Sequence, residues 1–272
     1  MLLASNKCAS SSRRTITLGR VPGSQGSGLP ITGERTVPDV AEENYWFRRH
    51  EACYRWALDH LTGHFRGTLR PTVLDAGAGE GFGSAMAADR GYLVTAVELD
   101  GLAATHAQRR YRELGVVRAN LVALPVRSDA FDACLSLQVI EHIWDVPSYL
   151  AELLRCTLGP VILSTPNRPV HSPGLAPGAK PSNVFHVREY DLTELDELLR
   201  PHLQATGRRA AHFGVRHGPA ISEWEERNGS LPAALISGSV PEFADAVQQT
   251  DFVIEPFTRE RAGEYLDLVS VL

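Results

Sequence analysis

The fold is decided by one stretch of sequence, Val73-Leu74-Asp75-Ala76-Gly77-Ala78-Gly79-Glu80-Gly81-Phe82-Gly83. Its first residues are an apolar run that predicts a short strand, and the alanine-rich sequence after it predicts a helix to about residue 89. Between them, three glycines allow the backbone to turn sharply and to approach a ligand, because glycine has no Cβ atom. This order predicts a loop that wraps a nucleotide-like cofactor, and a tight turn without a ligand is the alternative.

The spacing of the glycines distinguishes between cofactors. A dinucleotide fingerprint, G-x-G-x-x-G, would place its third glycine at position 82, where the sequence has Phe82. The pattern is D-x-G-x-G-x-G instead, which resembles motif I of the class I S-adenosylmethionine-dependent methyltransferases. The resemblance implies that S-adenosylmethionine is the cofactor and that Asp75, Gly77, Gly79 and Gly81 hold its amino-acid and ribose parts. Asp75 would order the loop and help to hold the methionine ammonium group.

Two later segments add cofactor contacts. The predicted strand 93–98 ends in Glu98, and a carboxylate at this strand end can accept hydrogen bonds from both ribose hydroxyls. The same geometry serves NAD, so Glu98 indicates a ribose rather than one particular cofactor. By the family resemblance, Asn120 would meet the adenine amino group and Leu121 would cover the ring. The family commonly has Asp in place of Asn120, and an asparagine that caps its own turn is the alternative.

The rest of the chain alternates between strands and helices. Continuous apolar strands separated by helices predict an α/β fold with a parallel sheet covered on both faces. The resemblance implies a Rossmann-like, doubly wound, mostly parallel sheet of seven strands with an N-terminal lid helix. Strands are expected at residues 72–76, 93–98, 116–119, 131–137, 160–164 and 211–215, with further strand sequence at 251–254 and 265–272.

The domain organisation follows from the same patterns. Residues 1–33 are rich in Ser, Gly, Thr and Arg, which predicts a disordered tail. Residues 34–272 are expected to form one methyltransferase domain, in which 34–66 is the lid helix and 166–190 is an acceptor loop too long for a plain connection. By the resemblance, Trp46 and Arg49 could cover the adenosyl group or its carboxylate. Packing in the core is the alternative for the aromatic side chain.

Composition disfavours several other classes of protein. The chain has 272 residues, of which 43% are hydrophobic and 22% charged, as in an ordinary globular protein. The formal net charge of -5 disfavours a surface that binds nucleic-acid phosphates. The sequence shows neither an apolar run of about 20 residues nor the apolar core of a signal peptide, so no membrane span and a cytoplasmic location are expected. Composition leaves the oligomeric state open.

The stretch Phe131–Ile143, which contains the fourth predicted strand and the segment after it, carries the catalytic candidates. It resembles the family's motif IV and the E-V-L-E-H sequence that follows it, which places Leu137 and Gln138 beside the reacting sulfur. His142 is the first candidate for a general base, with Glu141 as its orienter. The matching Glu-x-x-Glu-His sequence is associated with a divalent metal in ubiquinone-pathway O-methyltransferases. Gln138 replaces the first acid here, so no metal is expected. His186 is the second candidate for the base, and packing, capping or loop anchoring is the alternative for both histidines.

Two further segments indicate the acceptor. Leu163–Arg168 and Asn183–Tyr190 resemble the L-S-T-P-N-R and N-P-F-H-x-R-E-[FY] segments of small-molecule and sugar methyltransferases. A loop rich in Asn, Arg, His and Tyr suits a hydroxyl-bearing acceptor, either a small molecule or an oligosaccharide. Residues 34–50 and 215–219 resemble the methyltransferase associated with mycofactocin biosynthesis, which acts on the oligosaccharide of that redox cofactor. We therefore expect O-methylation of a glycan or a glycosylated small molecule.

Three alternatives remain at this stage. The acceptor could be a phenolic quinone-type precursor, which would want a flatter and less polar pocket. The chain could be an NAD-dependent oxidoreductase, which Phe82 and the absence of a Tyr-x-x-x-Lys pair disfavour. It could also be a catalytically inactive module that keeps the cofactor fold, although such a module would be expected to lose glycines from the loop and none is lost.

Overall fold

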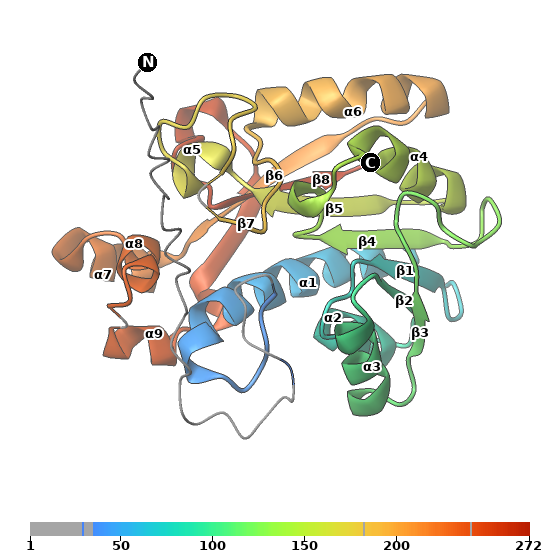
Figure 1. Ribbon diagram of the computed structural model, residues 1–272, viewed down its shortest axis with the longest axis horizontal. Helices are drawn as coiled ribbons and strands as arrows, with labels where there is room; N and C mark the ends of the chain where they lie inside the picture. Colours follow the sequence, from blue (N-terminus) through green and yellow to red (C-terminus); the bar gives the residue numbers. More distant parts are fainter. Residues whose placement is uncertain (1–28, 30–34, 182, 240) are drawn as a thin grey trace, which may run out of the picture.

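A central sheet of eight strands carries the predicted loops at one edge (Figure 1). The computed structural model describes residue 29 and residues 35–181, 183–239 and 241–272, so the tail predicted for 1–33 lies, apart from Leu29, outside the described residues. Within the described part of the chain the strand order is β3-β2-β1-β4-β5-β8-β6-β7. The strands are β1 (Thr72–Ala76), β2 (Leu93–Glu98), β3 (Gly115–Arg118), β4 (Ala133–Leu137), β5 (Val161–Pro166), β6 (Ala211–His217), β7 (Phe252–Pro256) and β8 (Asp267–Val271).

The first five strands are parallel and create the switch point of the sheet. β1 pairs with β2 on one side and with β4 on the other, and β3 and β5 extend the two halves outward. The strand order therefore reverses between β1 and β4. In doubly wound sheets, ligands bind beside such a reversal, at the carboxyl ends of the strands. The glycine loop after β1 and the catalytic segment after β4 both lie at this position.

Three antiparallel strands complete the sheet. β8 lies between β5 and β6 and runs antiparallel to both, while β7 pairs antiparallel with β6 at the outer edge. The described sheet therefore has eight strands and not the seven that the family resemblance implied. The difference is β7, whose apolar side chains extend the sheet beyond β6 and cover an edge that would otherwise be open.

Helices cover both faces of the sheet (Figure 1). α1 (Asn44–His64), α2 (Phe82–Asp89) and α3 (Gly101–Arg110) lie on one face, and α4 (Val146–Cys156) and α6 (Leu192–Thr206) lie on the other. Neighbouring strand residues alternate between two cores, because Val73 packs with the α1 side chains and Leu74 with those of α4 and α6. No helix of the described residues is long and apolar enough to cross a membrane. The remaining elements are α5 (Arg168–His171), α7 (Pro219–Asn228), α8 (Leu231–Ile236), α9 (Glu242–Ala246), η1 (Ala41–Glu43), η2 (Ile140–His142), η3 (Gln249–Asp251) and η4 (Arg259–Arg261).

The predicted lid helix is mostly an element of the core. α1 begins at Asn44, well after the expected start near residue 34, and its Ala57, Leu58 and Leu61 are fully buried against the sheet. Its apolar stripe therefore serves packing along most of its length. A helix held in this way along the sheet face covers the carboxyl edge only with its first turns.

A short strap ahead of α1, residues 35–40, reaches the carboxyl edge of the sheet instead. Val37 is fully buried, and Thr36 Oγ1 lies 3.3 Å from His50 Nδ1. The Arg35 guanidinium donates to Asp100, directly after β2, at 3.0 Å. The strap thus crosses from α1 to the strand end that carries the predicted ribose-binding acid.

Candidate active site

The glycine loop after β1 adopts backbone angles that favour glycine. The φ angle is 86° at Gly77, 56° at Gly79 and 97° at Gly81. A Cβ atom on Gly77 would lie 2.5 Å from Val139 Cγ2, and one on Gly81 would lie 2.9 Å from Ala107 Cβ. A Cβ atom on Gly79 would meet nothing within 4 Å. Packing within the chain thus accounts for two of the glycines, while the open space beside Gly79 leaves room for a ligand.

Asp75 lies at the end of β1, beneath this loop. Its carboxylate accepts hydrogen bonds from the Tyr54 hydroxyl at 3.1 Å and the Ser84 hydroxyl at 2.5 Å. Burial raises the pKa of Asp75 to about 6, against the lowering effect of these two donors. The contacts tie the start of the loop to α1 and α2. The expected contact with the methionine ammonium group stays a prediction.

Glu98 lies on the other side of the loop. One carboxylate oxygen accepts the Gly79 backbone N–H at 2.9 Å, and the other accepts the Asp100 backbone N–H at 2.7 Å. Each oxygen has a second lone pair, so the carboxylate can still accept two hydroxyl donors. Together with the space beside Gly79, this donor and acceptor set fits a cofactor that carries a ribose.

The third predicted cofactor segment, Asn120 and Leu121, makes contacts within the protein itself. Asn120 is exposed, and its side-chain oxygen accepts the Val122 backbone N–H at 3.2 Å. This is the turn-capping geometry that the sequence left as the alternative. Leu121 is buried in the core behind the turn. A contact of either residue with the adenine stays a prediction.

The aromatic and basic residues of α1 are held by the protein itself. Arg49 is buried, with Nε 3.2 Å from Asp267 Oδ2 and Nη1 3.2 Å from His171 Nε2. Its guanidinium carbon lies 5.0 Å from the centre of the Trp46 ring, which packs against the core. The core-packing interpretation of Trp46 therefore describes what the structure contains, and cofactor contacts of both residues stay predictions.

The chain turns sharply where β4 ends at Leu137. Gln138 has a φ angle of 58°, which is uncommon for a residue with a Cβ atom. Its backbone N–H donates to the carbonyl oxygen of Ser164 at 3.0 Å, and its side-chain amide donates to the Ser164 hydroxyl at 3.1 Å. These bonds to β5 hold the turn that leads into η2.

The structure brings the three predicted catalytic residues together. A carboxylate oxygen of Glu141 and one ring nitrogen each of His142 and His186 lie within 4.8 Å of one another. The two imidazole rings meet edge to face, with centroids 5.1 Å apart. Glu141 and His142 belong to η2, whereas His186 comes from the loop after β5. The loop is fixed to η2 because the Glu141 carbonyl oxygen accepts the backbone N–H groups of Val187 and Arg188.

Partners that the sequence did not identify orient both histidine rings. His142 Nδ1 lies 2.9 Å from the Phe185 carbonyl oxygen, which only accepts, so in the neutral ring Nδ1 carries the hydrogen and Nε2 the lone pair. His186 Nδ1 lies 2.7 Å from Glu189 Oε1, and its Nε2 lies 3.0 Å from the Asn183 amide nitrogen. A carboxylate placed in this way fixes the ring and stabilises the imidazolium that forms when the ring takes a proton.

The electrostatics of the cluster come from carboxyl groups deep in the protein. Burial raises the pKa of Glu141 to about 7, against the lowering effect of the nearby His186. Burial also raises the pKa of Asp267, against the lowering effect of Arg49. The pKa of His171 is lowered by burial and by the charge of Arg49. A carboxyl group with a pKa of about 7, as at Glu141, can exchange protons near neutral pH, which is useful in general acid–base catalysis.

The cluster also contains the donor types that bind divalent metals. A carboxylate oxygen and two imidazole nitrogens, from Glu141, His142 and His186, are ligands that zinc and related ions accept. The sequence predicted no metal because Gln138 stands where an acid was needed. His186 supplies a different third donor, so the absence of a metal stays a prediction that a chelator can test.

Some of the buried polar atoms without hydrogen-bond partners belong to this cluster and to the loop that carries His186. Among the described residues, eight buried side-chain nitrogen and oxygen atoms have no hydrogen-bond partner. Arg49 Nε is one of them, because its 3.2 Å approach to Asp267 Oδ2 is an ion-pair distance without hydrogen-bond alignment. Such atoms are rare in folded proteins. They are Arg49 Nε, Glu141 Oε2, Thr165 Oγ1, Ser172 Oγ, Arg188 Nε, Glu189 Oε2 and both carboxylate oxygens of Asp267.

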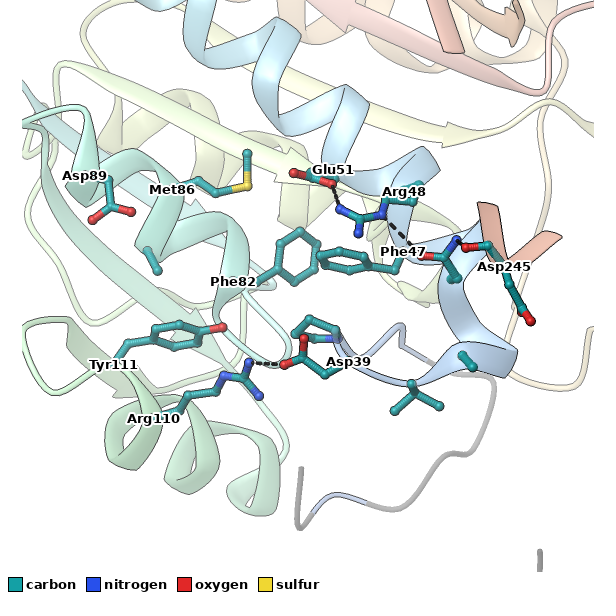
Figure 2. Close-up of a pocket in the computed structure, with 15 residues that line it drawn as sticks. Asp39, Phe47, Arg48, Glu51, Phe82, Met86, Asp89, Arg110, Tyr111 and Asp245 are labelled. Carbon is teal, nitrogen blue, oxygen red and sulfur yellow. Dashed lines mark hydrogen bonds and ion pairs between the residues drawn. The ribbon is translucent and has the colours of Figure 1, made fainter. Parts of the chain in front are cut away.

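A separate cavity of about 500 Å³ lies between α1, α2 and the end of α3. Figure 2 shows Phe47 and Phe82 facing each other there, with ring centroids 5.0 Å apart. Arg110 bonds to Asp39 of the strap at 2.8 Å across one side of the cavity. None of the residues predicted to bind cofactor or acceptor lines this cavity. The predicted site and the cavity are therefore different places.

Comparison with known proteins adds to this geometry. A family model described as a methyltransferase domain matches residues 74–158. A protein from Mycolicibacterium smegmatis, named as a probable S-adenosylmethionine-dependent methyltransferase, is 36% identical over 258 residues, which cover 90% of this chain and 95% of that protein. A Mycobacterium tuberculosis protein, also named as a probable S-adenosylmethionine-dependent methyltransferase, is 37% identical over 256 residues, or 89% of each chain. The solved structure of a Thermotoga maritima methyltransferase shares the fold, with a TM-score of 0.52 and 16% identity over 83% of this chain and 91% of that one.

Proposed function

The chain belongs to the class I S-adenosylmethionine-dependent methyltransferases, and we propose that it methylates a hydroxyl oxygen of a glycan or of a glycosylated small molecule. S-adenosylmethionine is the cofactor of this family, and it supplies the methyl group on a positively charged sulfur. Family membership removes the NAD-dependent oxidoreductase and the inactive module from the functions that the sequence left open. The acceptor is what remains to be identified.

The unpaired buried atoms around Glu141, His142 and His186 are the observation that supports a polyhydroxylated acceptor. Among the described residues, Glu141 and Glu189 each contribute one such carboxylate oxygen, and an ionised carboxylate only accepts. Thr165 and Ser172 contribute hydroxyl groups, whereas the atoms of Arg49 and Asp267 already form an ion pair with each other. Leaving a buried polar atom unpaired costs about 1–3 kcal/mol, so a ligand that pairs several of them gains affinity. A sugar offers hydroxyls that both donate and accept.

A phenolic quinone-type precursor matches this lining less well. A flat aromatic ring carries few hydroxyl groups, so most of the buried carboxylate oxygens would stay unpaired beside it. The lining supports the glycan over the phenol for this reason. The resemblance of residues 34–50 and 215–219 makes the mycofactocin oligosaccharide the first glycan to assay.

The residues of the cluster have separate roles in the proposed reaction. A sugar hydroxyl is a weak nucleophile at neutral pH, so a base within hydrogen-bond reach is expected to accelerate transfer by about 10²–10⁴-fold. His142 and His186 are the two base candidates, and Glu189 stabilises the second as an imidazolium. The proton moves from the acceptor oxygen to an imidazole nitrogen as that oxygen forms its bond to the methyl carbon; the bond between this carbon and the sulfur breaks, and S-adenosylhomocysteine leaves. Asp75, Gly79 and Glu98 hold the cofactor in line with the acceptor.

The test begins with cofactor binding and then compares acceptors. Calorimetry should show that S-adenosylhomocysteine binds and that NAD does not. The enzyme is then incubated with S-adenosylmethionine and either the mycofactocin oligosaccharide, a panel of gluco-, manno- and galacto-oligosaccharides or a catechol. Mass spectrometry should detect the gain of one methyl group on a glycan. Methylation of the catechol alone would contradict the proposal.

A chelator and a control variant test whether a metal or the histidines carry the activity. Methyl transfer that continues in excess EDTA fits catalysis by the protein side chains, whereas loss of activity that zinc restores would assign a metal to Glu141, His142 and His186. His202→Ala serves as the control variant, because His202 lies near the carboxyl end of α6, on a different element from η2 and from the loop that carries His186. It should retain acceptor methylation, while His142→Ala and His186→Ala should each lower its rate.

A further inference from the structure

Two large apolar side chains are exposed beside the catalytic histidines. Trp144 is 87% exposed and Val184 is 75% exposed. Trp144 follows His142 by two residues, in the connection between η2 and α4, so the Cα atoms of Trp144 and His142 lie within about 7 Å. Val184 precedes Phe185, whose carbonyl oxygen lies 2.9 Å from His142 Nδ1. The two apolar side chains therefore flank the contact that joins η2 to the acceptor loop.

This exposure has no explanation in the packing of the described residues. The other tryptophans, Trp46, Trp56 and Trp224, are partly buried and pack against a core cluster. Two large exposed apolar side chains on segments that contact each other offer a ligand apolar area, and covering the indole ring with a ligand would remove that area from water. The backbone N–H groups of Val187 and Arg188 donate to the Glu141 carbonyl oxygen and hold the loop that carries Val184 against η2. Val184 and Trp144 therefore have fixed backbone positions relative to each other.

We propose that Trp144, with Val184 beside it, binds the sugar unit adjacent to the one that is methylated. This inference rests on the proposed glycan acceptor and adds a second subsite to it. A pyranose ring has hydroxyls on its edge and an apolar face of C–H groups. Buried carboxylates suit the edge of the unit in the site, and an indole plane suits the C–H face of its neighbour.

The proposal requires an acceptor of at least two sugar units. A monosaccharide would occupy the polar cluster alone, so it would not contact Trp144. An oligosaccharide would reach both places, and its affinity would exceed that of the single sugar by the stacking contact. One such contact corresponds to roughly a tenfold gain in affinity. The preference for longer acceptors should therefore disappear when the indole is removed and persist when another aromatic ring replaces it.

Fluorine NMR tests binding at this position without relying on turnover. The chain has four tryptophans, so protein labelled with 5-fluorotryptophan should give four signals, and Trp144→Phe assigns one of them by its loss. Titration with gluco-, manno- and galacto-trisaccharides should move the Trp144 signal for at least one of them, whereas the corresponding monosaccharides should not. No shift with any trisaccharide at concentrations that saturate turnover, or in the tens of millimolar where none is turned over, would overturn the inference.

Kinetics separate this inference from the proposed function. Trp144→Ala should raise KM for an oligosaccharide acceptor roughly tenfold, leave KM for a monosaccharide unchanged, and Trp144→Phe should recover most of the loss. Leu69→Ala is the matched control, since Leu69 is 93% exposed but lies before β1 at the opposite edge of the sheet. If glycans are methylated and Trp144→Ala keeps the wild-type KM, the subsite is wrong and the function stands. If the NMR signal moves but no glycan is methylated, the function is wrong.

Discussion

The Nδ1 atom of His186 lies 2.7 Å from Oε1 of Glu189, and the other oxygen of the same carboxylate is buried without a partner. The pair resembles the imidazole–carboxylate arrangement in which an acid holds the ring of a general base. His186 and Glu189 both lie in the loop between α5 and α6. The other base candidate, His142, is oriented by the backbone carbonyl of Phe185. The two histidines therefore differ in how well a positive charge on the ring would be stabilised.

This difference makes the histidine variants informative. We expect His186→Ala to lower the rate of methyl transfer by about 10²–10⁴-fold if it is the base, and His142→Ala to have the smaller effect. Glu189→Gln keeps an oxygen that can accept the Nδ1 hydrogen but loses the charge, so its kcat should fall less than that of Glu189→Leu. Binding of S-adenosylhomocysteine should be unchanged in all four. If His142→Ala and His186→Ala both keep the wild-type rate, the assignment of the base is wrong.

A comparison of two glycines tests the cofactor loop. Gly79 and Gly91 both have positive φ angles, 56° and 89°, and a Cβ atom on either would meet nothing within 4 Å. Alanine should therefore cost similar stability at both positions, about 1–2 kcal/mol from backbone strain alone. We expect only Gly79→Ala to weaken the binding of S-adenosylhomocysteine, by at least about tenfold by analogy with other lost close contacts. Equal affinity of the two variants in calorimetry would place the cofactor elsewhere.

The pKa of Glu141 predicts how stability depends on pH. Burial raises this pKa from 4.5 to about 7, so between these values the folded state binds more protons than the unfolded state. The stability contributed by the neutral carboxyl group is present at low pH and is lost as the pH rises through about 7. Glu141→Gln should therefore stabilise the protein at pH 8, by up to about 3 kcal/mol, and much less at pH 5.

Urea unfolding at the two pH values, with a chelator present, measures this effect. Glu113→Gln is a suitable control because Glu113 is exposed, and its variant should follow the wild-type pH dependence. A gain from Glu141→Gln that is the same at pH 5 and pH 8 would show that the carboxyl group does not titrate in this range.

Arg49 and Asp267 form a buried ion pair, so substitutions at the two positions should have non-additive effects on the free energy of unfolding. Asp267 is fully buried and Arg49 is 3% exposed, so neither charge can be hydrated when its partner is removed. We expect Asp267→Asn to cost about 3–5 kcal/mol, as in other broken buried pairs. The double variant with Arg49→Met should recover much of this loss. Additive losses in urea unfolding would show that the two charges do not stabilise each other.

The local sequence was sufficient for the first two strands and for the glycine loop between them. β1 (Thr72–Ala76) and β2 (Leu93–Glu98) begin and end at the predicted residues, because apolar runs bounded by glycine or proline leave little choice of boundary. The positive φ angles at Gly77 and Gly81 were likewise implied by the residue type. The sequence also identified Glu141, His142 and His186, which the structure places together.

The contacts that orient the site could not be predicted in this way. Asp267 reaches Arg49 only because β8 pairs with β5, and no local pattern signals which strands become neighbours. Glu189 stands three residues after His186 in the quoted loop motif, but whether they meet depends on how the loop is folded. At Asn120 the sequence left a cofactor contact and a turn cap open; the structure shows the cap, and the cofactor contact stays a prediction.

The position of β8 has a consequence for how the enzyme is made. β8 follows every other strand in the sequence, yet it lies inside the sheet between β5 and β6 and carries Asp267 into the acceptor region. During synthesis the amino-terminal half can assemble the cofactor loop long before residue 267 leaves the ribosome. Before β8 forms, the nascent chain has an unpaired edge at β5, and Arg49 lacks its partner Asp267. Chaperones and proteases can bind the chain at this stage.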